Sequence, residues 1–331
     1  MFTEPMLRQH PALIRAFTGI PAEAFWEMLE KMEAQFSDYE TGRHMRDGRQ
    51  RSVGGGRKFG QPLALRTVAV LVYLRLHIPQ QAVALMFGLA QCDISRDLRR
   101  LLPLITAILP CPVIWEMAAG SEAPDELVVP SSGELPGGRV LIDATEQRVS
   151  RPGKDNATRK GYFSGKKKAF TLKTQVVADD DIDILAISVC VPGAVHDKKL
   201  SDSLATVARL PDGCEALADK GYQGMARQVG LVAIHNPETG LELLIPRLTV
   251  CTPFKKVADQ ELTEQQQAFN SRLGAVRVRV EHGIGWVKNW AIMANRFRCS
   301  HLIYTPIMQT VCGLVNAQTQ RWQMAHFAYC A

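Results

Sequence analysis

Three acidic residues stand at positions where carboxylates gather in metal-dependent phosphoryl-transfer sites. Asp143 follows the apolar run Val140–Ile142, and Asp219 follows the apolar run Ala216–Ala218. Glu281 lies further along, in a pattern typical of a long helix. Two-metal phosphoryl transfer needs hard oxygen ligands converging on two divalent ions about 3.5–4 Å apart, and carboxylates favour Mg²⁺ or Mn²⁺ over softer metals. The three acids therefore predict a site for two Mg²⁺ or Mn²⁺ ions.

The elements around these acids must bring them together. An aspartate after an apolar strand is, taken alone, most often a turn or cap residue. Two such strands side by side would place Asp143 and Asp219 at one edge of a sheet, and the helix of Glu281 would pack across that edge.

The helix that carries Glu281 also carries two basic residues on the same side. Arg277 lies one turn before Glu281 and Lys288 two turns after it, so the three share a face. There, Arg277 and Lys288 are expected to bind a DNA phosphate beside the metals. The alternative for Arg277 is an ion pair with Glu281, which is worth only about 0.2–0.5 kcal/mol.

Composition and patterning predict several segments. We expect N-terminal helices over 1–40, a flexible basic arm over 41–62, a helix-turn-helix domain over 63–118, a linker over 119–138, a catalytic domain over 139–320 with an insertion at about 223–260, and a tail over 321–331.

The helix-turn-helix prediction rests on helical patterns over 63–76, 80–89 and 96–109, with Asp93 as the expected N-cap of the third. The third helix would present four polar or basic side chains to DNA, namely Ser95, Arg96, Arg99 and Arg100. The alternative is an ordinary three-helix packing unit whose arginines are solvated.

Charge also favours a polyanionic partner. The net charge is +6, and basic residues concentrate in two runs, Arg43–Lys58 and Lys154–Lys173. From these runs we single out Arg57, Lys58, Lys166, Lys167 and Lys168 as DNA contacts, although a single run is as often a solvated face. The eight cysteines show no CxxC spacing, which disfavours a zinc site.

No apolar run approaches the ~18–20 residues that a membrane-spanning helix needs, and the first residues lack a signal-peptide pattern. We therefore expect a cytoplasmic protein with no membrane partner.

Several motifs resemble those of DDE transposases, in particular the bacterial insertion-sequence and Harbinger-type group. Leu141–Glu146 (LIDATE) resembles the first-aspartate motif, and Ala218–Tyr222 (ADKGY) resembles the second. Tyr162–Lys168 (YFSGKKK) with Lys173, the segment Pro192–Asp197 (PGAVHD), and the R-x3-E-x6-K spacing of Arg277, Glu281 and Lys288 are similar to further blocks of that group. Related transposases often carry a tyrosine three positions before this arginine, where this chain has Gly274.

The resemblance covers roughly residues 60–320. It implies an α/β fold, an RNase H-like mixed sheet with helices on both faces, preceded by an all-α helix-turn-helix domain. It implies a transposase that binds terminal inverted repeats, cleaves strands and transfers them. Asp143, Asp219 and Glu281 would be the catalytic metal ligands, and Glu146, His196 and Asp197 would lie around them. For Asp197 the alternatives are a DNA-facing group or the N-cap of the following helix, and for His196 a packing or phosphate contact. The partners would be double-stranded transposon ends and target DNA, bound by a homodimer or higher oligomer in the bacterial nucleoid.

Two alternatives stay open at this point. The first is a sequence-specific DNA-binding protein that has lost transposition, which the intact acids disfavour. The second is a different nuclease or a phosphatase with the same carboxylate chemistry, although the basic arm and the helix-turn-helix pattern disfavour a small-molecule substrate.

Overall fold

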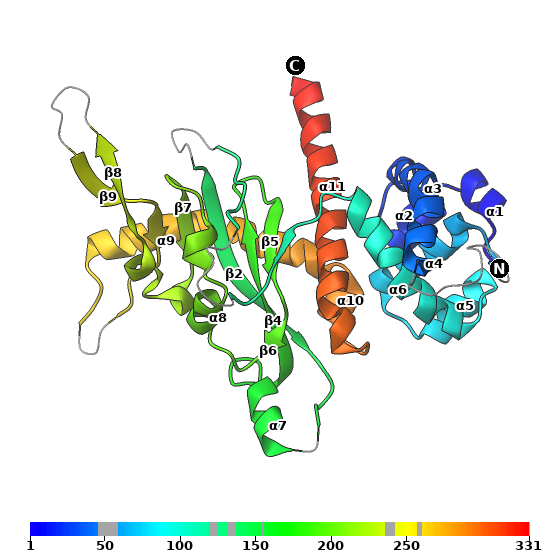
Figure 1. The fold of residues 1–331 in the computed structure, drawn as a ribbon, viewed down its shortest axis with the longest axis horizontal. Helices are drawn as coiled ribbons and strands as arrows, with labels where there is room; N and C mark the ends of the chain where they lie inside the picture. Colours follow the sequence, from blue (N-terminus) through cyan, green and yellow to red (C-terminus); the bar gives the residue numbers. More distant parts are fainter. Residues whose placement is uncertain are drawn as a thin grey trace. The chain divides into compact units, whose positions relative to one another are not determined.

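The computed structural model describes residues 1–45, 59–118, 125–131, 137–153, 155–235, 242–256 and 260–330 (Figure 1). Its contacts divide the chain into two compact units. The helical unit comprises Met1–Cys111 and Lys288–Gln318, and the sheet unit comprises Pro112–Val287 and Thr319–Ala331. Arg57 and Lys58 of the expected arm lie outside the described residues, as does much of the expected linker.

The helical unit combines helices from both ends of the sequence. They are α1 (Glu4–Gln9), α2 (Ala12–Thr18), α3 (Ala22–His44), α4 (Leu63–Leu76), α5 (Gln80–Phe87), α6 (Gln91–Ile108), α10 (Ala291–Ala294), the 3₁₀ helix η4 (His301–Ile303) and α11 (Tyr304–Cys330) as far as Gln318. Helix α10 contacts α4, and the hydroxyls of Thr106 and Thr310 lie 2.8 Å apart, so helices from both ends of the sequence pack together in this unit.

Helix α4 forms the centre of this unit because nearly all of its side chains are apolar. Residues Ala64 to Leu74 are buried without interruption. Arg66 is a charged residue in this buried run. It forms two hydrogen bonds with the buried carboxylate of Asp97 on α6, at 2.9 and 2.5 Å. A buried charge needs such a partner, so this pair fixes α4 against α6.

Two helix boundaries differ from the sequence predictions. Helix α6 begins at Gln91, so Asp93 is not its N-cap; Ala90 holds that position, and the Asp93 carboxylate accepts a hydrogen bond from the Ala90 N–H at 3.2 Å. Helix α3 continues to His44, past the expected start of the arm at residue 41, and the salt bridge from Arg43 to Glu40 supports its last turn.

The sheet unit is built on a mixed sheet. Its central path runs β1–β5–β4–β2–β7–β10, and the short strands β3 and β6 pair with β4. β2 pairs in parallel with β7 and antiparallel with β4. The strands are β1 (Val113–Trp115), β2 (Arg139–Arg148), β3 (Phe163–Ser164), β4 (Ala169–Ala178), β5 (Ile184–Ser188), β6 (Val191–Pro192), β7 (Glu215–Ala218) and β10 (Thr249–Cys251), and β8 (Leu231–His235) with β9 (Glu242–Pro246) forms a separate hairpin.

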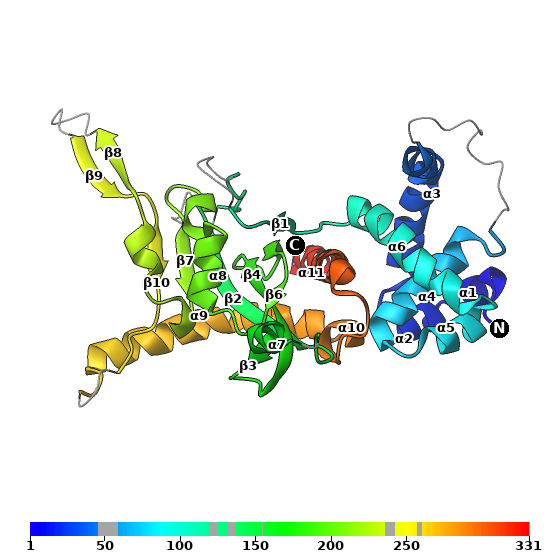
Figure 2. The ribbon, with the colours of Figure 1, turned by 60° about the horizontal axis from the view of Figure 1, so that its bottom comes forward.

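Helices lie on both faces of this sheet. Figures 1 and 2 show α8 (Asp197–Ser203) and α9 (Glu264–Lys288) on opposite sides of β2 and β7. The remaining helices are α7 (Asn156–Tyr162) and the 3₁₀ helices η1 (Thr206–Arg209), η2 (Lys220–Tyr222) and η3 (Met225–Gln228). Helices α8 and η1 are separate elements, because Ala205 between them has a positive φ of 51°. This mixed α/β architecture is compatible with the RNase H-like expectation.

The core under α8 follows from strand alternation. Ile142 and Ala218 belong to a buried cluster with Leu200 and Leu204 on the α8 side of the sheet. Because successive strand residues point to opposite faces, Asp143, next to Ile142, projects towards α9.

Strand β1 was not predicted. Residues 113–115 were expected to belong to the helix-turn-helix domain, but they pair in parallel with β5, and Trp115 is buried in the sheet core. Among the helices of the described residues, none combines the length and the hydropathy needed to span a membrane.

Candidate active site

Asp143 and Asp219 lie side by side at one edge of the sheet. In the parallel pair of β2 and β7, Ile142 is opposite Ala218, and each aspartate is the next residue along. One oxygen of each carboxylate is fixed by a nearby backbone N–H, from Ala144 to Asp143 at 2.7 Å and from Gly221 to Asp219 at 2.6 Å. The sheet therefore brings the two sequence-predicted aspartates together.

The environment of Asp143 disfavours an isolated negative charge. The pKa of its carboxyl is raised to about 6, chiefly by burial, and the neighbouring carboxylates of Asp219 and Glu281 contribute to this rise. The Ala144 N–H and the guanidinium of Arg277 act in the opposite direction. A bound cation would relieve this repulsion between carboxylates.

Helix α9 supplies the remaining predicted residues. Arg277 reaches towards the sheet, and its Nη2 lies 4.0 Å from Oδ2 of Asp143. Its Nε is buried and has no hydrogen-bond partner among the described residues. The described structure contains no ion pair between Arg277 and Glu281, the structural alternative considered above. Glu281 is exposed, and α9 continues unbroken to Lys288, so helix periodicity keeps all three on one side.

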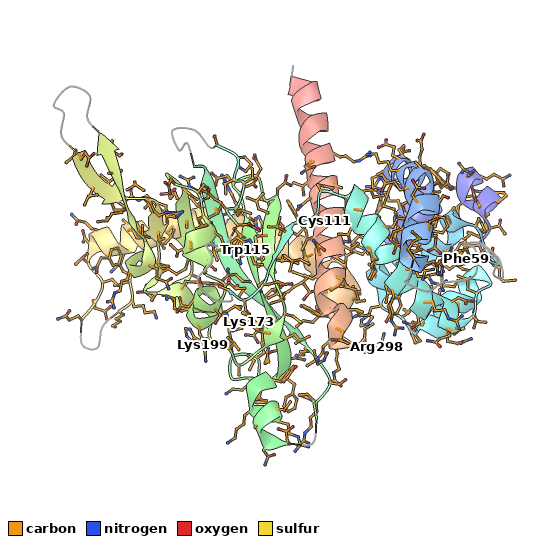
Figure 3. The ribbon with its side chains drawn as sticks, viewed as in Figure 1. Phe59, Cys111, Trp115, Lys173, Lys199 and Arg298 are labelled. Carbon is orange, nitrogen blue, oxygen red and sulfur yellow. The ribbon has the colours of Figure 1, made fainter. Side chains whose placement is uncertain are left out.

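A buried lysine lies on the other face of the sheet. Lys173 on β4 is opposite Glu146 on β2, and its Nζ lies 3.6 Å from Oε1 of that glutamate. The same Nζ donates hydrogen bonds to the carbonyl of Val195 at 2.6 Å and to Oδ1 of Asp197 at 2.7 Å. Glu146 and Asp197, predicted to lie around the metal ligands, are thus held together by one cation (Figure 3 labels Lys173).

Two glycines allow Asp197 to reach this position. Gly193 donates its N–H to the carbonyl of Thr171 at 2.9 Å, and a Cβ there would lie 1.7 Å from the Thr171 hydroxyl. A Cβ on Gly221 would lie 2.7 Å from Oδ2 of Asp197 and 2.8 Å from Oδ1 of Asp219. Asp197 and Asp219 therefore flank Gly221 closely, which no side chain at residue 221 would permit. His196 is exposed and is the N-cap of α8, so Asp197 is the first residue of this helix and not its N-cap.

Tyr222 is a site residue that the sequence reasoning did not single out. It is fully buried, and its hydroxyl has no hydrogen-bond partner among the described residues. Burial raises its pKa well above the usual value, and Asp197, Asp143 and Asp219 all add to that rise. All three carboxylates are therefore near enough to the phenol to act on its ionisation. Its place in the ADKGY motif was the available signal, and for Lys173 the signal was its place in the basic run.

The residues present fit a divalent cation. Carboxylate oxygens are the donors that Mg²⁺ and Mn²⁺ prefer. The Tyr222 hydroxyl and Nε of Arg277, whose Nη2 lies 4.0 Å from Asp143, both lack a hydrogen-bond partner among the described residues. In the arrangement described, no three His, Cys, Asp or Glu side chains are close enough to hold a metal ion. Asp143 and Asp219 form the fixed pair, and the exposed Glu281 would have to turn towards them from α9.

The other predicted DNA contacts are distributed over both units. Lys166, Lys167 and Lys168 are exposed in the turn between β3 and β4. On α6, Arg99 is exposed, Arg96 pairs with Asp93 at 3.1 Å, and Arg100 lies 5.5 Å from the Phe59 ring. Ser95, also on α6, is partly buried.

Comparison with known proteins agrees with this geometry. A family model described as DDE superfamily endonuclease matches residues 142–316, more than half of the chain. A probable transposase for insertion sequence element IS702 from Microchaete diplosiphon is 28% identical over 190 residues, which cover 57% of this chain and 59% of that protein. The chain thus matches less than two thirds of this relative's length. The resemblance inferred from the sequence motifs is confirmed: the chain belongs to the DDE superfamily endonucleases.

Proposed function

We propose that this protein is a DNA transposase that binds terminal inverted repeats, cleaves strands with the help of divalent metal ions and transfers them to target DNA. The main support is that Asp143 and Asp219 occupy equivalent positions along two adjacent parallel strands. Arg277 of α9 is directed at the Asp143 carboxylate. The endonuclease family of the chain and the transposase name of its relative agree with this proposal.

In this proposal Asp143, Asp219 and Glu281 hold two Mg²⁺ or Mn²⁺ ions. When bound, such ions activate an attacking water or 3′-hydroxyl and stabilise the leaving oxygen. Arg277, whose side chain is largely buried, positions the scissile phosphate through its fork of N–H donors. Lys288 lies two turns after Glu281 on the same side of α9, and it adds a point charge that binds the flanking phosphate.

The residues on the other face of the sheet have a supporting role. Lys173 neutralises Glu146 and Asp197, so those two acids do not compete for the cations that Asp143 and Asp219 bind. The sheet order β5–β4–β2–β7–β10, with β4 antiparallel to β2 and to β5 and the others parallel, supports an RNase H-like assignment.

The helical unit is proposed to bind the transposon ends. Helices α4, α5 and α6 contact one another, and a short turn joins α5 to α6, as in a helix-turn-helix. Arg96 and Arg99 on the exposed side of α6 would meet DNA, and the lysine turn 166–168 would contact the phosphate backbone. Because two ends have to be joined to one target, a homodimer or higher oligomer is expected.

The direct test uses a plasmid that carries the DNA flanking the gene, incubated with protein and Mg²⁺. Asp143→Asn, Asp219→Asn and Glu281→Gln should each abolish nicking and strand transfer while duplex binding is kept. Asp38→Asn, which changes an exposed acid on α3, is the control and should be fully active. Full activity in any of the three site variants would refute the metal site, and duplex binding without nicking by the wild type would favour a DNA-binding protein without transposition activity.

A further inference from the structure

The helical unit contains a cavity of about 440 Å³ with both polar and apolar lining residues. One side is formed by the first turns of α5 and α6, with Gln80, Gln91 and Ser95. The other side is formed by Arg298 and Ser300, in the segment that follows α10. Figure 3 shows Arg298 in this segment. Residues more than 200 positions apart in the sequence therefore share one cavity.

The walls of the cavity are connected by hydrogen bonds. Nε2 of Gln91 donates to Oε1 of Gln80 at 2.5 Å, which joins α6 to α5. The hydroxyl of Tyr73 on α4 lies 3.1 Å from Sγ of Cys299, which joins α4 to the segment after α10. The cavity is consequently part of the packed unit rather than a gap between loops.

Two arginines line this cavity, Arg99 on α6 and Arg298. Burial raises the pKa of the Cys299 thiol, and Arg298 and Arg99 both oppose that rise, so both charges lie near the same sulfur atom. Among the described residues, no Asp or Glu lines the cavity. Two like charges without a counterion repel each other, and this arrangement favours an anion between them.

Arg298 is held in place before any ligand binds. Its Nη2 donates a hydrogen bond to the carbonyl of His77, the residue that ends α4 with a positive φ of 48°. Arg99 lies one helical turn after Ser95, whose hydroxyl can donate to the same anion. A guanidinium that is already fixed loses little rotamer entropy when it binds a phosphate.

We propose that this cavity binds a backbone phosphate of duplex DNA, gripped by Arg99 from the N-terminal helices and by Arg298 from the segment after α10. The inference rests on the proposed function, because it takes duplex DNA as the ligand. It extends the DNA-binding surface beyond the helix-turn-helix to residues that follow the catalytic helix α9 in the sequence. Neutral donors of Gln80 and Ser300 in the lining suit a phosphodiester, which carries a single charge.

The test measures affinity of the full-length protein for duplex DNA over a series of salt concentrations, without divalent ions. Arg298→Gln and Arg99→Gln should each reduce the slope of log K against log salt by about 0.9, which corresponds to about eightfold weaker binding at ~0.1 M salt. Arg298→Lys keeps the charge and should keep the slope. Arg296→Gln is the matched control, because Arg296 is exposed in the same segment but does not line the cavity; it should bind at least fivefold more tightly than Arg298→Gln.

Several results would overturn the inference. If Arg99→Gln and Arg298→Gln kept the wild-type salt slope, or if Arg296→Gln lost as much duplex affinity, the cavity would not be part of the DNA interface. The proposed function would remain intact. If inorganic phosphate alone stabilised the wild type but not Arg298→Gln, and duplex affinity were unchanged, the cavity would bind free phosphate instead. Absence of any duplex binding by the wild type would refute both proposals. Arg99 is an exposed helix residue, so loss of folding is not expected to obscure its result.

Discussion

Nζ of Lys173 lies 2.7 Å from Oδ1 of Asp197, and this contact joins the middle of the sheet to the first turn of α8. Lys173 is buried, with 8% of its side chain exposed, and it also faces Glu146, which is equally buried. The lysine is therefore the shared counterion of two acids, Glu146 on β2 and Asp197 on α8.

Replacing this cation should destabilise the fold strongly. Lys173→Met would leave Glu146 and Asp197 without a counterion, and removing one partner of a buried ion pair costs about 2–4 kcal/mol when one acid retains some exposure. Lys199→Met on the surface of α8 is the control and should change stability by less than about 0.5 kcal/mol. Urea unfolding of both variants checks this, and equal midpoints would contradict the counterion role.

The raised pKa of Asp143 predicts a pH-dependent stability in the absence of metal. The pKa is about 6 in the folded chain against 3.8 ordinarily, so the folded state binds the proton more tightly. The resulting stabilisation is complete below pH ~4 and is lost as pH rises through about 6. Asp143→Asn removes this dependence, so the variant should gain about 1–3 kcal/mol relative to the wild type between pH ~4 and pH ~7.5.

Urea unfolding in EDTA at the two pH values measures the difference. Burial also raises the pKa of Asp179 to about 6, but Asp179 is present in both proteins and its contribution cancels. A gap between wild type and variant that stayed constant with pH would contradict the assignment. Mg²⁺ should stabilise the wild type and have a smaller effect on Asp143→Asn, because the variant lacks one carboxylate ligand.

The close approach at Gly221 predicts a loss of activity. In Gly221→Ala the added Cβ would meet Asp197 and Asp219 at 2.7 and 2.8 Å, so one or both carboxylates must move. Mg²⁺-dependent nicking should fall at least tenfold, since an error of about 1 Å in the position of a catalytic group can cost about 100-fold.

Gly274→Ala is the matched control for that variant. Gly274 is exposed on α9, and a Cβ there meets nothing within 4 Å. Alanine is the better helix former by about 0.8–1.0 kcal/mol, so this variant should be slightly more stable and fully active. Equal activity of the two alanine variants would show that the carboxylates tolerate displacement.

The features that the sequence predicted are those encoded locally. Asp143 and Asp219 could be placed because each follows an apolar strand, and α9 because its helical pattern is long. The position of Lys173 could not, because it depends on the register that pairs it with Glu146. Strand β1 was missed for a similar reason, because Trp115 pairs with Ser188, which is far away in the sequence. The three residues of β1 are also too few to show an alternating pattern of apolar and polar residues.

The start of α6 was predicted too late because Asp93 is compatible with two capping positions. An aspartate favours the N-cap, but at the third helical position it can also accept a hydrogen bond from the N-cap backbone, as it does from Ala90. Which of the two occurs depends on how α5 and α6 pack, and local propensity does not contain that information.

The buried hydroxyl of Tyr222 provides a last prediction, in which stability and activity change in different directions. A buried hydroxyl without a hydrogen-bond partner is unfavourable, so Tyr222→Phe should leave the urea midpoint unchanged or raise it. Because Asp143, Asp197 and Asp219 all act on the ionisation of the phenol, we expect its O–H to donate to one of these carboxylates when the site is loaded. Nicking in Mg²⁺ should then fall about tenfold, and the Mg²⁺ concentration for half-maximal nicking should rise. A variant that is both less stable and fully active would show that the hydroxyl has a structural partner and no part in positioning the acids.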